Sequence, residues 1–228
     1  MAGGGERDSR APAQDGDCIV SASTTRQQRL FEYAAIAVFA LLAGWSALRL
    51  AATAQWLLLP ILLLAAPVAW LFTDLLSGVV HWACDCFGSV NTPVVGNAII
   101  RPFREHHGDP QAMTQHDFVE THGASCFAAL PFLIASSLLP LDGFLADLLQ
   151  ASLLLIALGA LATNQCHKWA HMDRAAVPAA IRWAQRHHLV LPDWHHRQHH
   201  TAPFDSHYCM SSGWLNPLFN AVLLRCRR

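Results

Sequence analysis

The sequence has few charged residues. Asp, Glu, Lys and Arg make up 14% of its 228 residues, against roughly 25% in average globular domains. The formal net charge is -1 with histidine neutral, so no basic field points to nucleic acid as a partner. Hydrophobic residues, in contrast, make up 53% of the chain. This balance argues against a soluble, basic or disordered protein and favours a membrane protein with polar chemistry at its margins.

Two common metal motifs are also absent. The chain contains no HExxH, which removes the usual zinc-protease interpretation, and no CxxC pair of the zinc-finger kind. Its seven cysteines are an odd number in an apolar chain, so they do not resemble a disulfide scaffold. We expect them to be reduced and mostly to pack in the interior.

Four apolar runs organise the chain. Residues 1–29 are small and polar and predict a disordered tail, not a cleaved signal peptide. Residues 30–228 predict one all-α membrane domain, a four-helix bundle, because about 20 apolar residues cross a bilayer as a helix. The expected spans lie near 30–52, 56–80, 124–141 and 146–166. The last two are shorter, so a buried soluble hairpin is the alternative for them.

The arginines predict the orientation in the membrane. Apart from Arg49 near the end of the first run, they precede the first run, lie between the second and third, or follow the fourth. This places both termini and the 81–122 loop in the cytosol. All fourteen histidines fall into two blocks outside the runs, one before the third run and one after the fourth. Because two crossings return the chain to the same side, both blocks should meet there as a cytosolic cap.

The histidine spacing is typical of metal ligands on helices. His81 with Asp85, and His167 with His171, are i, i+4 pairs that share a helix face. The stretch HHRQHH, residues 195–200, supplies further such pairs on one expected short helix. Imidazole suits iron, zinc, copper or nickel, and so many ligands suggest two metals. For His122, His187 and His207 we expect an ordinary surface role, while His116 and His188 are left open.

Longer motifs carry a specific resemblance. HWACDCFGSV, PVVGNAIIRPFREHH, TQHDFVETHG, TNQCHKWAH, HHRQHH and YCMSSGWLNPL, within residues 70–218, resemble the plasmanylethanolamine desaturases. That family is also called Kua or CarF-like and is related to plant plastid lipid desaturases of the FAD4 type.

The resemblance implies a multi-pass membrane oxidoreductase with two iron ions. Such an enzyme forms the vinyl-ether double bond of plasmalogens in 1-O-alkyl ethanolamine phospholipids. It uses O2, with electrons from NAD(P)H through cytochrome b5 and its reductase. It would lie in the endoplasmic reticulum of a eukaryote or the inner membrane of a bacterium. No catalytic residue is implied beyond the metal ligands, whose candidates are His81, Asp85, His106, His107, His116, His167, His171, His195, His196, His199 and His200.

Two departures from the wider desaturase pattern leave the ligand count open. The usual first box HxxxH reads HxxxD here, at His81 and Asp85. The usual HxxHH has Phe103 in place of a histidine, and His116 could replace that missing ligand. Other functions also stay open at this point. They are desaturation of a phospholipid acyl chain as in the plant relatives, another histidine-box membrane hydroxylase or hydrolase, and a non-enzymatic membrane adaptor.

Overall fold

The computed structural model describes residues 25–93, 95–140 and 143–222, and within them it contains helices and loops but no strand. The helices follow one another along the chain as α1 (Arg26–Ala54), η1 (Gln55–Leu57), α2 (Leu58–Cys86), η2 (Gly96–Ile100), α3 (Arg101–Gly108), η3 (Ala112–Gln115), α4 (Phe118–Leu138), α5 (Phe144–His171), α6 (Ala179–Arg186), α7 (Asp193–His196) and α8 (Asn216–Val222). Helix α1 therefore begins before the expected end of the tail at 29, and residues 1–24 lie outside the described residues.

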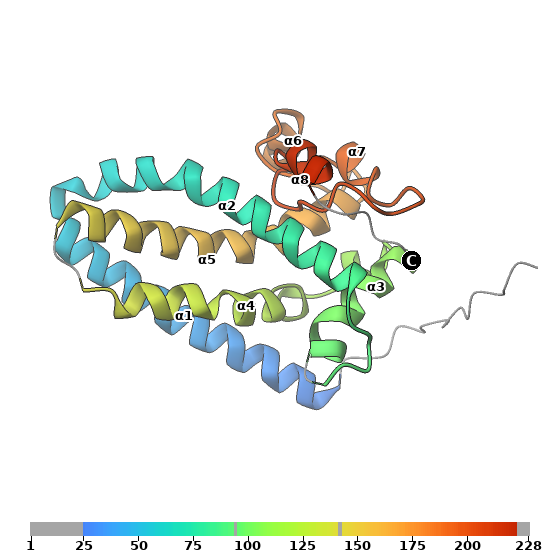
Figure 1. The fold of residues 1–228 in the computed structure, drawn as a ribbon, viewed down its shortest axis with the longest axis horizontal. Helices are drawn as coiled ribbons and strands as arrows, with labels where there is room; N and C mark the ends of the chain where they lie inside the picture. Colours follow the sequence, from blue (N-terminus) through green and yellow to red (C-terminus); the bar gives the residue numbers. More distant parts are fainter. Residues whose placement is uncertain (1–24, 94, 141–142, 223–228) are drawn as a thin grey trace, which may run out of the picture.

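Four long helices, α1, α2, α4 and α5, run side by side, and the short helices gather at one end of them (Figure 1). Helix α4 packs against α1 and α5, and α5 also packs against α2. The chain reverses between α1 and α2 at Gln55, whose φ of 44° lies in the left-handed region. The all-α class is confirmed. The four long helices coincide with the four apolar runs, and the four-span membrane bundle stays a prediction.

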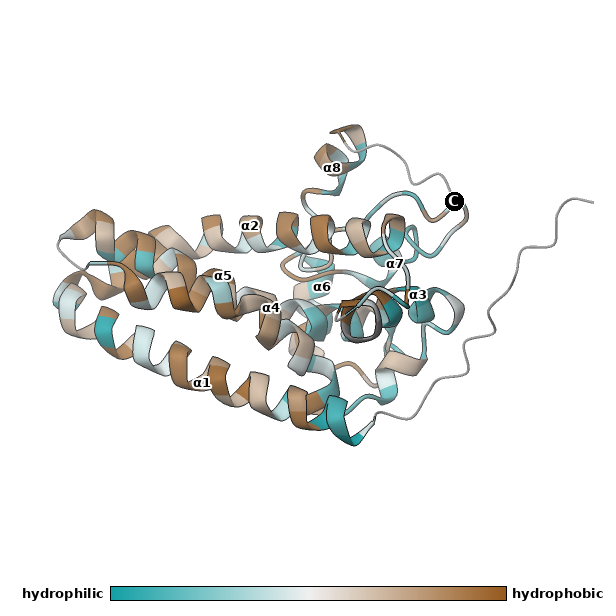
Figure 2. Ribbon diagram, turned by 60° about the horizontal axis from the view of Figure 1, so that its bottom comes forward, coloured by the Kyte–Doolittle hydropathy of each residue, from teal (hydrophilic) through white to brown (hydrophobic). Residues whose placement is uncertain are grey.

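The long helices are apolar on their outer faces as well as on the faces that pack against one another. Three continuous helical segments are long and apolar enough to cross a membrane, and the first of them, Arg26–Cys86, contains both α1 and α2. Large apolar side chains such as Leu41, Leu63 and Leu145 are 74%, 67% and 78% exposed. Hydropathy is high along the long helices and low where the short helices gather (Figure 2). A helix that is apolar on its outer face suits lipid, and the chain is a membrane protein.

Helices α2 and α5 are longer than a bilayer requires. They contain 29 and 28 residues, so each measures about 42–44 Å at roughly 1.5 Å per residue. A hydrocarbon core is about 30 Å thick. Both helices end where the short helices gather (Figure 1). The last turns carry His81 and Asp85 on α2, and His167 and His171 on α5.

A buried carboxylate joins the C-terminal segment to α2. Asp74 is fully buried. Its Oδ1 accepts hydrogen bonds from the backbone N–H groups of Ser211, Ser212 and Gly213 at 3.1, 2.8 and 2.9 Å, and its Oδ2 accepts from Leu215 N–H at 3.1 Å. Backbone donors of an irregular segment must find acceptors when buried. Asp74 meets this need and fixes residues 211–215 beside the helix.

The cysteines in the described residues follow the expectation with one exception, while Cys18 and Cys226 lie outside those residues. Cys84, Cys126, Cys166 and Cys209 are buried free thiols. The expectation of reduced cysteines is wrong for Cys86, which is disulfide-bonded.

Candidate metal centre

Helix α3 presents two adjacent histidines to the ends of the long helices. Arg104 fixes this helix, because its guanidinium donates to the carbonyl oxygens of Cys84, Phe87 and Gly88 at 3.0–3.1 Å. These carbonyls lie at and just beyond the C-terminal end of α2, where backbone acceptors lack helical partners. The contact therefore holds His106 and His107 beside the last turn of α2.

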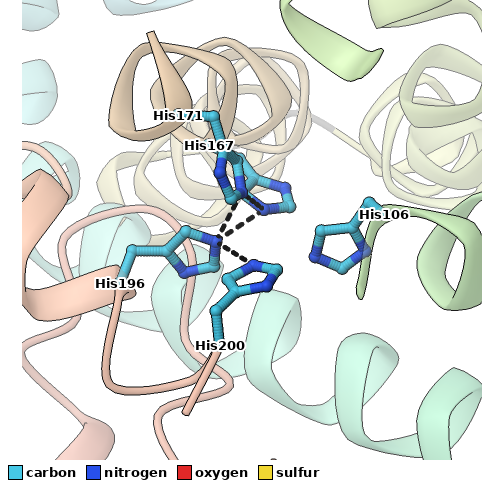
Figure 3. Close-up of side chains that lie close together, drawn as sticks. All are labelled: His106, His167, His171, His196 and His200. Atoms are coloured by element: carbon cyan, nitrogen blue, oxygen red, sulfur yellow. Dashed lines mark hydrogen bonds between the residues drawn. The ribbon is translucent and has the colours of Figure 1, made fainter. Parts of the chain in front are cut away.

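Five imidazoles from three parts of the chain form a first group. Their rings point toward one another (Figure 3), and one nitrogen from each lies within 4.8 Å of all the others. The Nε2 atom of His196 lies 2.9 Å from that of His167, 2.8 Å from that of His171 and 3.1 Å from that of His200. The members of this group are His106, His167, His171, His196 and His200.

Hydrogen bonding alone does not explain this packing. The Nε2 atoms of His167, His171 and His196 are in mutual contact at 2.8–3.1 Å. A ring nitrogen either carries a proton and donates, or carries a lone pair and accepts. Among three nitrogens in mutual contact, two must therefore have the same role and oppose each other. One cation bound to all three lone pairs removes the conflict, and nitrogens about 2.1 Å from one ion are about 3.0 Å apart at a right angle.

A second group lies next to the first and shares His106 with it. His81, His106, His107 and His199 again place one nitrogen each within 4.8 Å of the others. The Asp85 carboxylate adjoins them, with its Oδ2 3.0 Å from His107 Nε2 and 3.6 Å from the Nε2 atoms of both His81 and His199. His81 and His199 are fully buried. This set of imidazoles with one carboxylate also fits a transition-metal ion.

Backbone carbonyls set the orientation of two of these rings. His106 Nδ1 donates to the carbonyl of Phe103, and His199 Nδ1 donates to that of Ser206. A carbonyl can only accept, so in each neutral ring the lone pair is on Nε2. The buried Nε2 of His106 has no hydrogen-bond partner among the residues that the structure describes. A second hydrogen bond of this kind is how proteins fix the tautomer of a metal-binding histidine.

Burial favours the neutral form of three of these imidazoles, His106, His196 and His200. Loss of contact with solvent is the main cause, and the proximity of other histidines the second cause, that hold the pKa of His106 and of His196 well below the usual value. The same causes lower the pKa of His200 to about 3. A neutral imidazole is the form that binds a metal ion. These three rings can therefore bind a cation at neutral pH without first losing protons.

Three of the eleven candidate ligands lie outside both groups: Asp85, which adjoins the second group, and His195 and His116, which do not. His195 Nε2 contacts the Asn216 side-chain amide at 2.9 Å, and its ring faces His207. His116 lies 3.5 Å from Glu120 and belongs to neither group, so its role as a substitute for the ligand missing at Phe103 stays a prediction. The stretch 195–200 is not one helix as expected, because α7 ends at His196 and turns follow it. His196 and His200 still share a group, whereas His199 joins the second one and His195 points away.

Sequence reasoning missed the residues that support these groups. The ring of Tyr208 packs 5.0 Å from that of His199 and 5.7 Å from that of His81, and the Phe103 ring lies 4.9 Å from His81. Asp74, which fixes residues 211–215, is visible in the sequence only as a lone charge in an apolar run. A charge that interrupts such a run is itself the signal, because an intramembrane carboxylate is costly unless it has partners.

The fold and the two histidine groups define a multi-pass membrane protein with a histidine-rich site that could hold metal ions. A model of the lipid desaturase domain matches residues 70–224, and the chain belongs to that family. The matched region includes both groups, and α1 lies outside it.

Three relatives show how far the similarity extends. The chain is 46% identical over 195 residues to plasmanylethanolamine desaturase of Myxococcus xanthus, covering 82% of this chain and 66% of the relative. It is 39% identical over 176 residues to mouse plasmanylethanolamine desaturase 1, covering 72% and 62%. It is 35% identical over 157 residues to the chloroplastic fatty acid desaturase 4 of Arabidopsis thaliana, covering 68% and 47%. The chain thus spans just under two thirds of the first two relatives. No solved structure matches it.

Proposed function

We propose that this protein is a lipid desaturase that forms the vinyl-ether bond of ethanolamine plasmalogens. In that reaction the 1-O-alkyl chain loses one hydrogen from each of the two carbons nearest the ether oxygen. O2 takes up these two hydrogens together with two electrons and two protons, and leaves as two water molecules. The observation that carries the proposal is the convergence of eight imidazoles from α2, α3, α5, α7 and the turns after α7.

The two groups would hold two iron ions. His167, His171, His196 and His200 would hold one, His81, His107 and His199 with Asp85 the other, and His106 lies between them. When bound, the metal supplies the activation of O2 that removal of hydrogen from an unactivated carbon requires, which side chains alone cannot provide. The protein contributes neutral ligands, fixed ring orientations and a site shielded from water by Tyr208 and Phe103.

The position of the groups suits a lipid chain. They lie at the ends of α2 and α5, just past the length of helix that a bilayer contains. A substrate whose reacting carbons adjoin the glycerol backbone would present those carbons at this depth. The names of the first two relatives specify an ether lipid of ethanolamine. Similarity to the chloroplastic desaturases makes an acyl chain the second candidate substrate.

The remaining expectations belong to the same proposal. We infer that the histidine end faces the cytosol, where cytochrome b5 and its reductase would deliver electrons from NAD(P)H. The membrane would be the endoplasmic reticulum in a eukaryote and the inner membrane in a bacterium. The domain would extend over residues 30–228.

Lipid analysis tests the proposal directly. Cells that lack their own enzyme and receive this chain should accumulate acid-labile vinyl-ether ethanolamine lipid, and cells receiving His196→Ala should not. His187→Ala is the matched control, because His187 packs on Trp183 outside both groups. A double bond that appears in an acyl chain instead would contradict the ether assignment. Unchanged lipids with the intact chain present in the membrane would contradict the function.

A further inference from the structure

A cavity adjoins the first histidine group. Its volume is about 220 Å³, and its wall is formed by residues of α1, α3, η3, α4 and α5. His106 and His167 are part of that wall. A molecule in this cavity would therefore contact two imidazoles of the proposed metal site on one side and the first turns of α1 and α4 on the other.

Carboxylates outnumber cationic groups in the wall of the cavity. Its lining contains one arginine, Arg101, and four carboxylates, Glu32, Glu105, Asp109 and Glu120. A ligand that carries a positive charge suits this balance, and Arg101 can pair with one negative charge on the same ligand.

Glu32 is the most informative of the carboxylates. It is only 5% exposed although it lies on an apolar helix. Its Oε1 accepts from the Gln28 amide at 3.3 Å, whereas its Oε2 has no hydrogen-bond partner within residues 25–93, 95–140 and 143–222. Arg29 approaches Oε2 only to 3.8 Å and is engaged in an ion pair with Asp117. A buried carboxylate oxygen without a donor is costly, and a donor on a ligand would remove that cost.

The close approach of α4 makes room for this side chain. A Cβ atom on Gly123 would lie 2.5 Å from Glu32 Cγ and 3.0 Å from its Cα. Glycine at 123 therefore allows Glu32 to remain buried between α1 and α4.

Arg101 completes a pair of opposite charges joined by one amide. Its Nη2 donates to Gln28 Oε1 at 3.4 Å, while the other end of the same amide binds Glu32. Its Nε lies 3.8 Å from Glu105 and makes no hydrogen bond to a described residue. Gln28 thus lies between one anionic and one cationic group, the arrangement that a small zwitterion requires.

We propose that this cavity binds the phosphoethanolamine headgroup, with Glu32 accepting a hydrogen bond from the primary ammonium and Arg101 contacting the phosphate. This inference rests on the proposed function. The ether carbons of the substrate lie only a few bonds from the phosphate, so a headgroup site must adjoin the metal site, as this cavity does. A choline headgroup has no N–H to donate, and Glu32 therefore selects against it.

Binding of short-chain lipids to the purified full-length protein tests the inference without turnover. The probes are a 1-O-alkyl phosphoethanolamine lipid and its phosphocholine counterpart, compared by calorimetry in detergent. The intact protein should prefer ethanolamine by about tenfold or more, the value of one charge-assisted hydrogen bond. Glu32→Gln should abolish the preference while leaving choline affinity unchanged, and Glu32→Asp should keep part of it. Arg101→Gln should weaken both lipids by a similar factor.

Asp173→Asn is the matched control, since it removes one charge from an exposed loop residue outside the cavity. It should retain the full preference. A preference that survives in Glu32→Gln, or a loss of affinity that is equal for both lipids in that variant, would overturn the headgroup site. If cells make vinyl-ether lipid but the protein binds both headgroups equally, the headgroup site fails and the proposed function stands. If the preference is present but no vinyl-ether lipid forms, the proposed function fails instead.

Discussion

Replacing Asp74 by asparagine removes the charge that holds the C-terminal segment against α2. In the native protein this carboxylate accepts four backbone hydrogen bonds from residues 211–215. The asparagine oxygen can retain the three bonds to Oδ1, but as neutral bonds that are roughly half as strong. Its amide group then faces the N–H of Leu215, donor against donor.

The expected loss follows from these contacts. Three weakened bonds contribute about 1 kcal/mol each, and one opposed donor, which is only part-buried, adds about 1 kcal/mol more. Docking of the segment should therefore weaken by about 4 kcal/mol, which is close to a thousandfold change in its opening equilibrium. The long helices should stay in place, because their insertion depends on their apolar residues.

Amide hydrogen exchange measures this opening directly. In Asp74→Asn the amides of residues 211–215 should exchange up to about a thousandfold faster, while those in the middle of α4 and α5 stay unchanged. Asp147→Asn is the matched control. Asp147 is also a buried carboxylate on a long helix, but it accepts from Thr53 at 2.7 Å at the opposite end of the bundle. Equal protection of residues 211–215 in Asp74→Asn and the intact protein would refute the reasoning.

Three further predictions follow from the site and the packing. Alanine at any one of five histidines from the two groups should abolish vinyl-ether formation with the protein still in the membrane; the five are His81, His107, His171, His196 and His200. Alanine at His122, His195 or His207 should leave the activity in place. Full activity of all five variants, measured as acid-labile lipid, would contradict the metal site. Epitope tags after Gly108 and after Arg174 should be accessible from one side of the membrane and a tag at the exposed Trp56 from the other; opposite accessibility of the first two would exclude the arrangement of four spans. Gly159→Ala should lower stability by about 1–3 kcal/mol, because its Cβ would lie 2.5 Å from Thr73 Oγ1 between α2 and α5; an unchanged thermal midpoint would show that the helices separate at no cost.

Hydropathy and helix periodicity predicted the fold well. Apolar runs of bilayer length with very few charges leave few alternatives to spanning helices, and the reversal near Gln55 follows from the short polar break there. The pairs His81 with Asp85 and His167 with His171 were predictable for the same reason, since each lies on a continuous helix whose period is known.

Ligand choice within HHRQHH could not be predicted. Helical spacing assigns His195 and His199 to one face, but α7 ends at His196, and the turns that follow send the two side chains to different places. What draws His195 away is Asn216, twenty-one positions further along the chain. Contacts of that separation depend on how the C-terminal segment folds over Asp74, which no local pattern encodes.

The metal content of the purified protein tests the central claim most directly. Protein expressed with ample iron and analysed by elemental mass spectrometry should contain two irons per chain, because two adjacent groups of imidazoles each offer enough ligands for one ion. His196→Ala should hold less iron, and its neighbour variant His195→Ala should hold as much as the intact protein. Fully active protein that contains zinc alone, or equal iron in His196→Ala and the intact chain, would contradict the account.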